Sequence, residues 1–195
     1  MIETKIKKGE KYMKVLVVVD MQNDFVTGAL GTPEAQAIVP AVEEKIKSYR
    51  DNPEDVVIAT RDLHAECTFI DGFMLEGKLI PAHCIRNTPG SKLIPCVDNS
   101  ANDVIGKHTF GTFAIEDSIY DFVFGPDDSE DNTIESIELC GVCTDICVVS
   151  NALILRAAFP DIPIIVDAKC CAGSTPEKHE AALKVMESCL IDVVR

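Results

Sequence analysis

The sequence has no apolar run that approaches the roughly 20 residues needed to cross a bilayer. The stretch before Met13 carries lysines but no hydrophobic segment, so we expect neither a signal peptide nor a membrane span. Basic residues are also few, since 18 Lys and Arg stand against 32 Asp and Glu, for a formal net charge of -14. Because such a chain repels phosphates, we expect no nucleic-acid partner and no anionic membrane partner.

Cysteine, in contrast, is plentiful. Nine cysteines in a chain without an export signal are typical of reduced thiols in the cytosol, which predicts a cytoplasmic protein. Apolar residues make up 47% and charged residues 26%, the balance of a globular chain, and 195 residues suffice for one domain with a substantial core. We find no internal repeat and no dividing linker. Residues 1–12 are predicted to be an N-terminal extension and residues 13–195 the domain itself.

Buried strands and amphipathic helices are expected to alternate along the chain. The apolar pattern predicts strands at 15–19, 56–60, 104–106, 134–141, 162–166 and 191–194. It predicts helices at 33–49, 113–124, 145–158 and 176–188, and a solvated acidic loop at 126–132. This alternation predicts an α/β fold with a mainly parallel sheet. Residues 61–102 do not fit the scheme, and a loop that long inside a compact domain is usually functional.

Three chemically reactive residues lie at or just beyond the carboxyl ends of predicted strands. Asp20 follows the first strand, Lys107 follows the third, and Cys147 lies in the first turn of the helix after the fourth. Each alone has an ordinary interpretation, as a turn aspartate, a solvated lysine or a packed cysteine. Ligands of parallel sheets bind beyond the carboxyl ends of the strands, however, so together these residues indicate one site.

The chemistry of the three side chains favours the same grouping. A thiol attacks as its thiolate, so it needs either a lowered pKa or a base beside it. Lys107 could supply positive charge, and Asp20 could accept the thiol proton and later protonate a leaving amine. Backbone N–H groups at the start of the helix that carries Cys147 could hold an oxyanion.

Three segments carry these residues in a pattern that resembles the isochorismatase-like cysteine hydrolases, a superfamily that includes nicotinamidases. The segments are VVDMQNDF at 18–25, GKHTF at 106–110 and GVCTDICV at 141–148. The resemblance covers about residues 13–194 and implies a catalytic triad of Asp20, Lys107 and Cys147. It also implies a three-layer αβα sandwich, with a six-stranded parallel sheet in the order 3-2-1-4-5-6, and a homo-oligomer.

Further site residues follow from the same resemblance. It implies a cis peptide bond between Val142 and Cys143, with the amides of Cys143 and Cys147 as oxyanion donors. Alanine is usual at position 143 in the family, so cysteine here places a second thiol near the nucleophile. Phe25 and Phe110 correspond to residues that line a pocket for a ring, although ordinary core packing is the alternative for both.

The long segment 61–102 contains candidate metal ligands. Asp62 and His64 form an Asp-x-His pair and His83 follows further on; from spacing alone, these are either surface residues or ligands. The resemblance implies a metal site with these three ligands and with Glu76, seven residues before His83, as the fourth. Cys67 is the competing ligand. Two imidazoles and two carboxylates suit one divalent metal ion, for which we expect zinc, with manganese or iron as alternatives.

The resemblance predicts an amidohydrolase of NAD salvage that converts nicotinamide and water to nicotinate and ammonia through a thioester on Cys147. Its expected partner is therefore a small-molecule amide. One alternative is another hydrolase of the superfamily, acting on a different small amide or a carbamoyl compound. A second alternative, from a different class, is a catalytically silent metal-binding protein or oligomeric partner. The intact triad argues against the silent protein, and metal content separates the two hydrolases.

Overall fold

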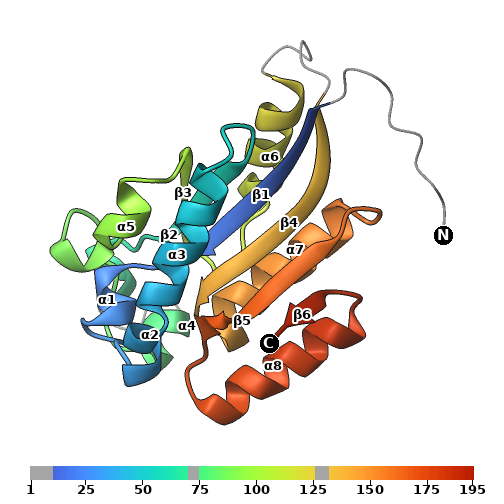
Figure 1. Ribbon diagram of the computed structural model, residues 1–195. Coiled ribbons are helices and arrows are strands. Elements are labelled where there is room, and N and C mark those ends of the chain that lie inside the picture. The colour runs from blue at the N-terminus through green and yellow to red at the C-terminus, as the bar shows by residue number, and fades with distance from the viewer. Residues whose placement is uncertain (1–10, 70–74, 126–131) are drawn as a thin grey trace.

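Six parallel strands form the centre of the computed structural model, which describes residues 11–69, 75–125 and 132–195 (Figure 1). The strands are β1 (Lys11–Val19), β2 (Val56–Asp62), β3 (Asp103–Lys107), β4 (Asn132–Val142), β5 (Ile164–Ala172) and β6 (Asp192–Val194). Their order is β3-β2-β1-β4-β5-β6, and every neighbouring pair is parallel. The six-stranded parallel sheet and its predicted order are therefore confirmed.

Residues 15–19 of β1 lie at the centre of the core, where every side chain of the run is fully buried. β1 pairs with β2 along one edge and with β4 along the other. A parallel strand covered on both faces takes apolar residues at every position, which explains the unbroken run of valines and leucine. Where the run ends, Asp20 emerges at the carboxyl edge of the sheet.

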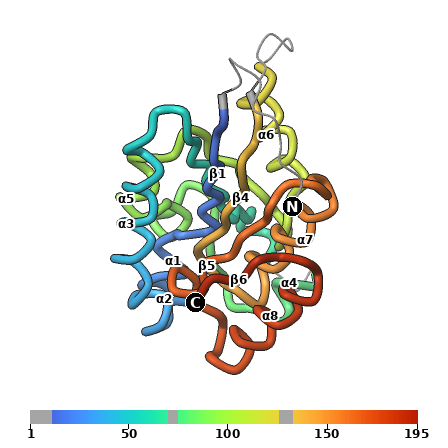
Figure 2. Tube along the Cα trace, turned by 45° about the vertical axis from the view of Figure 1, so that its right-hand side comes forward, coloured from blue at the N-terminus to red at the C-terminus, as the bar shows by residue number. Residues whose placement is uncertain are grey.

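Helices form the two outer layers. They are α1 (Asn23–Val26), α2 (Pro33–Ala37), α3 (Val39–Arg50), α4 (Leu75–Leu79), α5 (Pro95–Asp98), α6 (Ala114–Phe124), α7 (Val149–Ala158) and α8 (Pro176–Ser188). Figure 2 shows α3 and α5 on one side of β1 and β4, with α6 and α7 on the other. The expected three-layer αβα sandwich is confirmed. In the part of the chain that the structure describes, no helix has the length and hydrophobicity of a membrane span.

Several predicted boundaries are wrong, for identifiable reasons. The single helix predicted at 33–49 is two helices, α2 and α3, which separate at Ile38. Pro40 has no N–H to continue the hydrogen-bond ladder, and its ring is tolerated only in the first turn of α3. β5 continues to Ala172 rather than stopping at 166, because its last residues pair with the end of β4.

The predicted N-terminal extension and the predicted acidic loop lie mostly outside the described residues. β1 begins at Lys11, two residues before the predicted domain start at Met13, and residues 1–10 lie outside the described part. The same holds for 126–131, where the acidic loop was expected. Residues 61–102 hold short helices rather than one irregular loop: η1 (Glu66–Phe69), α4, η2 (Pro89–Ser91) and α5. This segment supplies one wall of the site described next.

Candidate active site and metal centre

Asp20 and Lys107 lie where β1 and β3 end, and Cys147 lies beyond the end of β4. The Nζ atom of Lys107 is 2.6 Å from Asp20 Oδ2 and 3.5 Å from Cys147 Sγ. All three side chains are buried. One ammonium group therefore joins the carboxylate and the thiol, and the structure brings together the three residues that the strand ends predicted.

Thr60, near the end of β2, fixes the orientation of the Asp20 carboxylate. Its hydroxyl donates to Asp20 Oδ1 at 2.7 Å and accepts the backbone N–H of Asp20 at 3.2 Å. Asp20 has a φ of 50°, which turns the chain sharply at this point. The remaining carboxylate oxygen, Oδ2, faces Lys107. Sequence reasoning did not single out Thr60, although a hydroxyl residue directly after the apolar residues 56–59 was the available signal.

Gly141 allows β4 to end in close contact with β1. Its φ is 116°, a backbone conformation that other residues rarely adopt. A Cβ atom at this position would lie 2.1 Å from the carbonyl oxygen of Val19. Only glycine fits there, and the chain can then turn from β4 towards the thiol.

Cys147 lies in a π-helical turn, η3 (Thr144–Val148), that leads into α7. The preceding peptide bond between Val142 and Cys143 is cis, as the resemblance implied. The carbonyl of Cys147 accepts a hydrogen bond of 2.8 Å from the Asn151 side chain. Sequence reasoning expected an α-helix from residue 145, and the π-turn is a correction. Single π-turns within helices occur frequently at functional sites.

The electrostatics of the buried group select one way of activating the thiol. Burial raises the pKa of Cys147 well above its ordinary value, and the nearby Asp20 carboxylate acts in the same direction. Burial also raises the pKa of Asp20, while Lys107 opposes that shift. Burial alone would lower the pKa of Lys107, but the Asp20 charge holds it above its usual range. The arrangement thus supports a protonated thiol with a base beside it, rather than a preformed thiolate.

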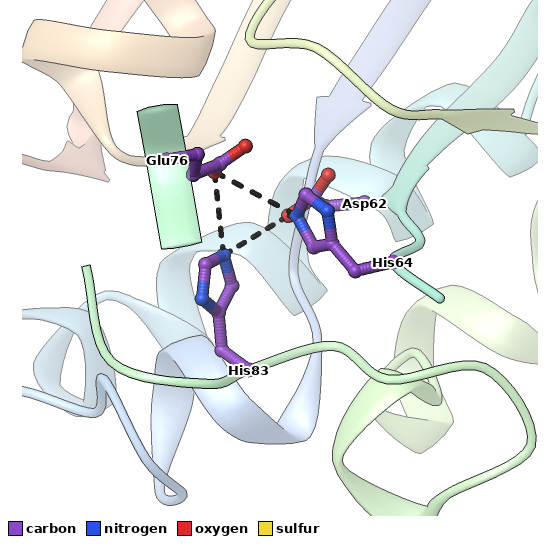
Figure 3. Close-up of side chains that lie close together, drawn as sticks. All are labelled: Asp62, His64, Glu76 and His83. Atoms are coloured by element: carbon purple, nitrogen blue, oxygen red, sulfur yellow. Dashed lines mark hydrogen bonds and ion pairs between the residues drawn. The ribbon is translucent and has the colours of Figure 1, made fainter. Parts of the chain in front are cut away.

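A second group of side chains, called the metal cluster below because its four residues could hold one metal ion, lies next to these residues. It consists of Asp62, His64, Glu76 and His83 (Figure 3). Asp62 and His64 come from the end of β2 and the residues after it, Glu76 from α4 and His83 from the following loop. The ligand atoms all lie within 4.8 Å of one another. His64 Nε2 is 2.8 Å from Asp62 Oδ2, and His83 Nε2 is 3.6 Å from Glu76 Oε1.

The cluster fits a divalent metal ion. Ligands at about 2.0–2.2 Å from a common ion lie roughly 3–3.5 Å apart, close to the separations found here. The Nδ1 atom of His83 donates to the Pro81 carbonyl at 2.7 Å, so its Nε2 presents a lone pair to the cluster. Burial opposes ionisation of Asp62, but its close contacts with His64 and His83 and the charge of Lys107 keep its pKa below its usual range. Deprotonated carboxylate and neutral imidazole are the forms that bind metals.

Glu76 rather than Cys67 completes the cluster. Cys67 lies in η1, where it is exposed, and it does not belong to the group of converging ligand atoms within the described residues. The sequence left these two candidates open, because spacing alone does not show how the chain folds back between residues 64 and 83.

Gln22 is a further buried residue that sequence reasoning did not assign. Its side-chain amide donates to the carbonyls of Asp62 and Ser91 at 2.9 Å each and accepts the N–H of Asp62 at 2.7 Å. It thereby holds the end of β2 in place beneath the metal cluster. The only sequence signal was its position two residues after Asp20 in the first motif.

One cavity of about 410 Å³ reaches both groups. Cys147 lines it together with Asp62, Glu76 and His83. Its apolar walls and mouth comprise Phe25, Leu30, Ile80, Phe110, Cys143, Ile146, Ser174 and Lys178, among others. The predicted pocket residues Phe25 and Phe110 therefore both face this cavity, whereas Ser174 and Lys178 were not foreseen. A cavity of this size, apolar with a few convergent polar groups, suits a small molecule.

Known proteins resemble this chain in both sequence and fold. Residues 14–195 match the isochorismatase domain family. The chain is 26% identical to nicotinamidase/pyrazinamidase of Mycobacterium tuberculosis, over 93% of this chain and 98% of the relative. It is similar to the crystal structure of pyrazinamidase of Pyrococcus horikoshii in complex with zinc, with a TM-score of 0.77, 28% identity and coverage of 93% and 98%. It is also similar to the crystal structure of N-carbamoylsarcosine amidase of Thermoplasma acidophilum, with a TM-score of 0.71 and 26% identity, over 94% of this chain and 96% of that chain.

Proposed function

This chain belongs to the isochorismatase family of hydrolases, and we propose that it is a nicotinamidase-like amidohydrolase that converts nicotinamide and water to nicotinate and ammonia. One observation carries the proposal: Cys147 and the metal cluster line the same cavity. Lys107 Nζ connects them, at 3.5 Å from Cys147 Sγ and 3.8 Å from Asp62 Oδ1. A small ring with a basic nitrogen at one side and a carboxamide at the other suits such a pair of neighbouring groups.

The first half of the reaction forms a thioester. Cys147 Sγ attacks the amide carbon as its proton passes to the Asp20 carboxylate, so a neutral thiol is never required to ionise alone. The carbonyl oxygen becomes an oxyanion, for which the backbone N–H groups of Cys143 and Cys147 are the proposed donors. Asp20 then gives the proton to the amide nitrogen, the C–N bond breaks, and ammonia leaves.

The second half regenerates the thiol. Water attacks the thioester carbon and passes a proton to Asp20. When the tetrahedral intermediate collapses, the C–S bond breaks, and Cys147 recovers a proton from Asp20 as nicotinate is released. Throughout, Lys107 keeps a positive charge beside whichever of Asp20 and Cys147 carries the negative charge, which limits the cost of charge in a buried site.

The ligand cluster beside the thiol, in the same cavity, would orient the substrate. Asp62, His64, Glu76 and His83 would hold one divalent ion, and zinc suits this donor set. Such an ion supplies a Lewis-acidic position for a ring nitrogen. Phe25 lies with its ring 5.4 Å from that of His83, so it would contact one face of a bound ring. Holding the carboxamide near Cys147 in this way lowers the entropic cost of attack.

A second candidate is a hydrolase for a carbamoyl compound that carries a carboxylate. The exposed Lys178 lines the same cavity and could pair with that carboxylate. The likeness to N-carbamoylsarcosine amidase supports this alternative. Nothing in such a substrate needs the aromatic walls and the metal cluster together, and we therefore favour nicotinamide.

The test compares ammonia release from nicotinamide and from N-carbamoylsarcosine by the purified full-length chain, with bound metal quantified in the same preparation. We expect rapid release from nicotinamide, with about one metal ion per chain. Release from N-carbamoylsarcosine alone would support the second candidate. Release from neither compound by a metal-loaded protein would contradict both.

A further inference from the structure

A second cavity, of about 490 Å³, lies at the ends of β2 and β3. Side chains alternate between the two faces of a strand. At the end of β2, Arg61 and Leu63 line this cavity, whereas Asp62 belongs to the metal cluster. At the end of β3, His108 lines it, whereas Lys107 reaches the thiol. The two cavities share no lining residue and are separate sites.

The lining of the second cavity includes three cations and no acidic side chain. Arg61, Arg86 and Lys92 line it, and none of its lining residues is Asp or Glu. The chain as a whole has only 18 basic residues against 32 acidic ones, so three cations in one cavity stand out. In the described part of the chain, no ion pair joins any of the three to a carboxylate. A concave surface with this charge concentrates anions.

The cationic groups of the cavity are also hydrogen-bond donors. Arg61 Nε is buried and has no hydrogen-bond partner among the described residues. A buried donor without a partner is costly and calls for an occupant. The hydroxyls of Thr88 and Ser91 already donate to backbone carbonyls, those of Ile85 and Thr88. What the cavity still offers a ligand is therefore positive charge and N–H groups.

His108 holds one of these cations in position. Its Nδ1 donates to the Leu63 carbonyl at 2.5 Å, and its Nε2 accepts from Arg86 Nη2 at 2.7 Å. A guanidinium group has only donors, so this pairing sets the tautomer of the histidine. The exposed Arg86 side chain is thus directed at the cavity by a residue whose chain neighbour, Lys107, contacts the thiol.

We propose that this cavity binds a small phosphate-bearing anion. The planar N–H groups of Arg61 and Arg86 match phosphate oxygens, which guanidinium groups can bind in pairs. Three cations also balance a phosphate monoester or pyrophosphate more fully than they balance a monocarboxylate. A nucleic acid is disfavoured as the source of the phosphate, because the net charge of -14 repels a long polyanion. The volume of about 490 Å³ is that of a small-molecule site.

The proposal is tested by calorimetric titration of the full-length, metal-loaded chain with inorganic phosphate, pyrophosphate and AMP. We expect at least one of these to bind, and the Arg86→Ala/Lys92→Ala variant to weaken it at least about tenfold, since each hydrogen bond to a charged group contributes substantially. The matched control is Lys47→Ala, which removes an exposed lysine of α3 and should bind as the wild type does. Tighter binding of AMP indicates a phosphate ester as ligand, and tighter binding of inorganic phosphate or pyrophosphate indicates the free anion.

Two results would overturn the proposal. One is that none of the three anions binds. The other is that binding is unchanged in Arg86→Ala/Lys92→Ala but lost in Glu76→Ala, which would place the anion at the metal cluster instead. Both exchanged side chains are exposed, and the single variant Lys92→Ala serves if the double variant does not fold. Ammonia release does not enter this test, so its outcome is independent of the proposed amidohydrolase function.

Discussion

Lys107, at the end of β3, reaches past the end of β2 to form a 2.6 Å ion pair with Asp20, at the end of β1. Both side chains are almost completely buried. Removing two charges from water is costly, and their attraction offsets that cost only while both are present and well placed. The pair therefore couples the stability of three strand ends to the chemistry of Cys147.

Replacing Asp20 by Asn should impair both stability and turnover. The variant keeps the shape of the side chain but leaves the Lys107 ammonium buried with Asp62, at 3.8 Å, as its nearest carboxylate. Breaking a buried pair in this way costs about 3–5 kcal/mol. Losing the proton acceptor of Cys147 should lower the turnover number by on the order of 10²–10⁴-fold. Chemical denaturation and ammonia release measure the two effects.

The double variant Asp20→Asn/Lys107→Met is the control for this pair. Because it leaves neither charge unpaired, it should be more stable than the sum of the two single variants predicts. Additive losses of stability would show that the ion pair is not energetically coupled. Near-normal turnover in Asp20→Asn would remove Asp20 from the mechanism.

Replacing Glu76 by Ala should weaken metal binding, while Cys67→Ser should leave it unchanged. Glu76 Oε1 lies 3.6 Å from the Nε2 atoms of both His64 and His83, whereas Cys67 is exposed outside the cluster. We expect the metal affinity of Glu76→Ala to fall by at least about 10–100-fold, the range seen even for residues that only support a ligand. Competition with a chelator, followed by metal analysis, gives the affinities. A loss confined to Cys67→Ser would reverse the assignment.

Replacing Phe110 by Ala should raise KM with little change in kcat. Phe110 lines the cavity and is 42% exposed, so its removal takes away apolar contact with the substrate without disturbing the core. Aromatic contacts of this kind are worth about 0.5–1.5 kcal/mol, which corresponds to a rise in KM of up to roughly tenfold. Phe113→Ala is the matched control, since Phe113 is 74% exposed and lies outside the cavity. Equal effects of the two substitutions would argue against a substrate contact at Phe110.

A pair far from the active site should govern stability in acid. Lys45 Nζ lies 2.9 Å from Asp167 Oδ2, where burial would raise the pKa of Asp167 but Lys45 holds it below its usual value. A lowered folded pKa gives stability that is present above about pH 4, where an unfolded aspartate ionises, and is lost as the pH falls through the folded value.

Asp167→Asn should therefore make the free energy of unfolding less dependent on pH in acid, and should lower it by about 1.5–3 kcal/mol at neutral pH. Chemical denaturation at pH values between 7 and about 2.5 measures this free energy. Asp161→Asn, at an exposed position, should follow the wild type. If the Asp167→Asn curve kept the wild-type slope in acid, Lys45 would not be the source of the shift.

The parts of the fold that local patterns determine were predictable. Residues 15–19 are apolar at every position because β1 is covered on both faces, and the positions of Asp20 and Lys107 follow from where strands end. Pro176 and Thr175 likewise mark the start of α8, since Thr175 accepts the N–H of Lys178 as a helix cap.

Features set by contacts between distant residues were not predictable. The turn that carries Cys147 is π-helical. In the same turn, the Asp145 carboxylate accepts a hydrogen bond from the backbone N–H of Ser174, 29 residues away. The choice of Glu76 over Cys67 depends on the path of the chain between residues 64 and 83. The hydrogen bond between Arg86 and His108 joins residues 22 positions apart, and no spacing pattern in the sequence predicts it.

The most direct test of Cys147 as the nucleophile is ammonia release from nicotinamide by Cys147→Ala beside the wild type, with metal content and unfolding midpoint measured for both. Turnover should fall by on the order of 10³-fold or more, because the thioester cannot form. Metal content and fold should be retained, since the thiol is not among the converging ligands of the metal cluster in the described residues. Turnover within about tenfold of the wild type, at equal metal content, would contradict the assignment of Cys147 as nucleophile.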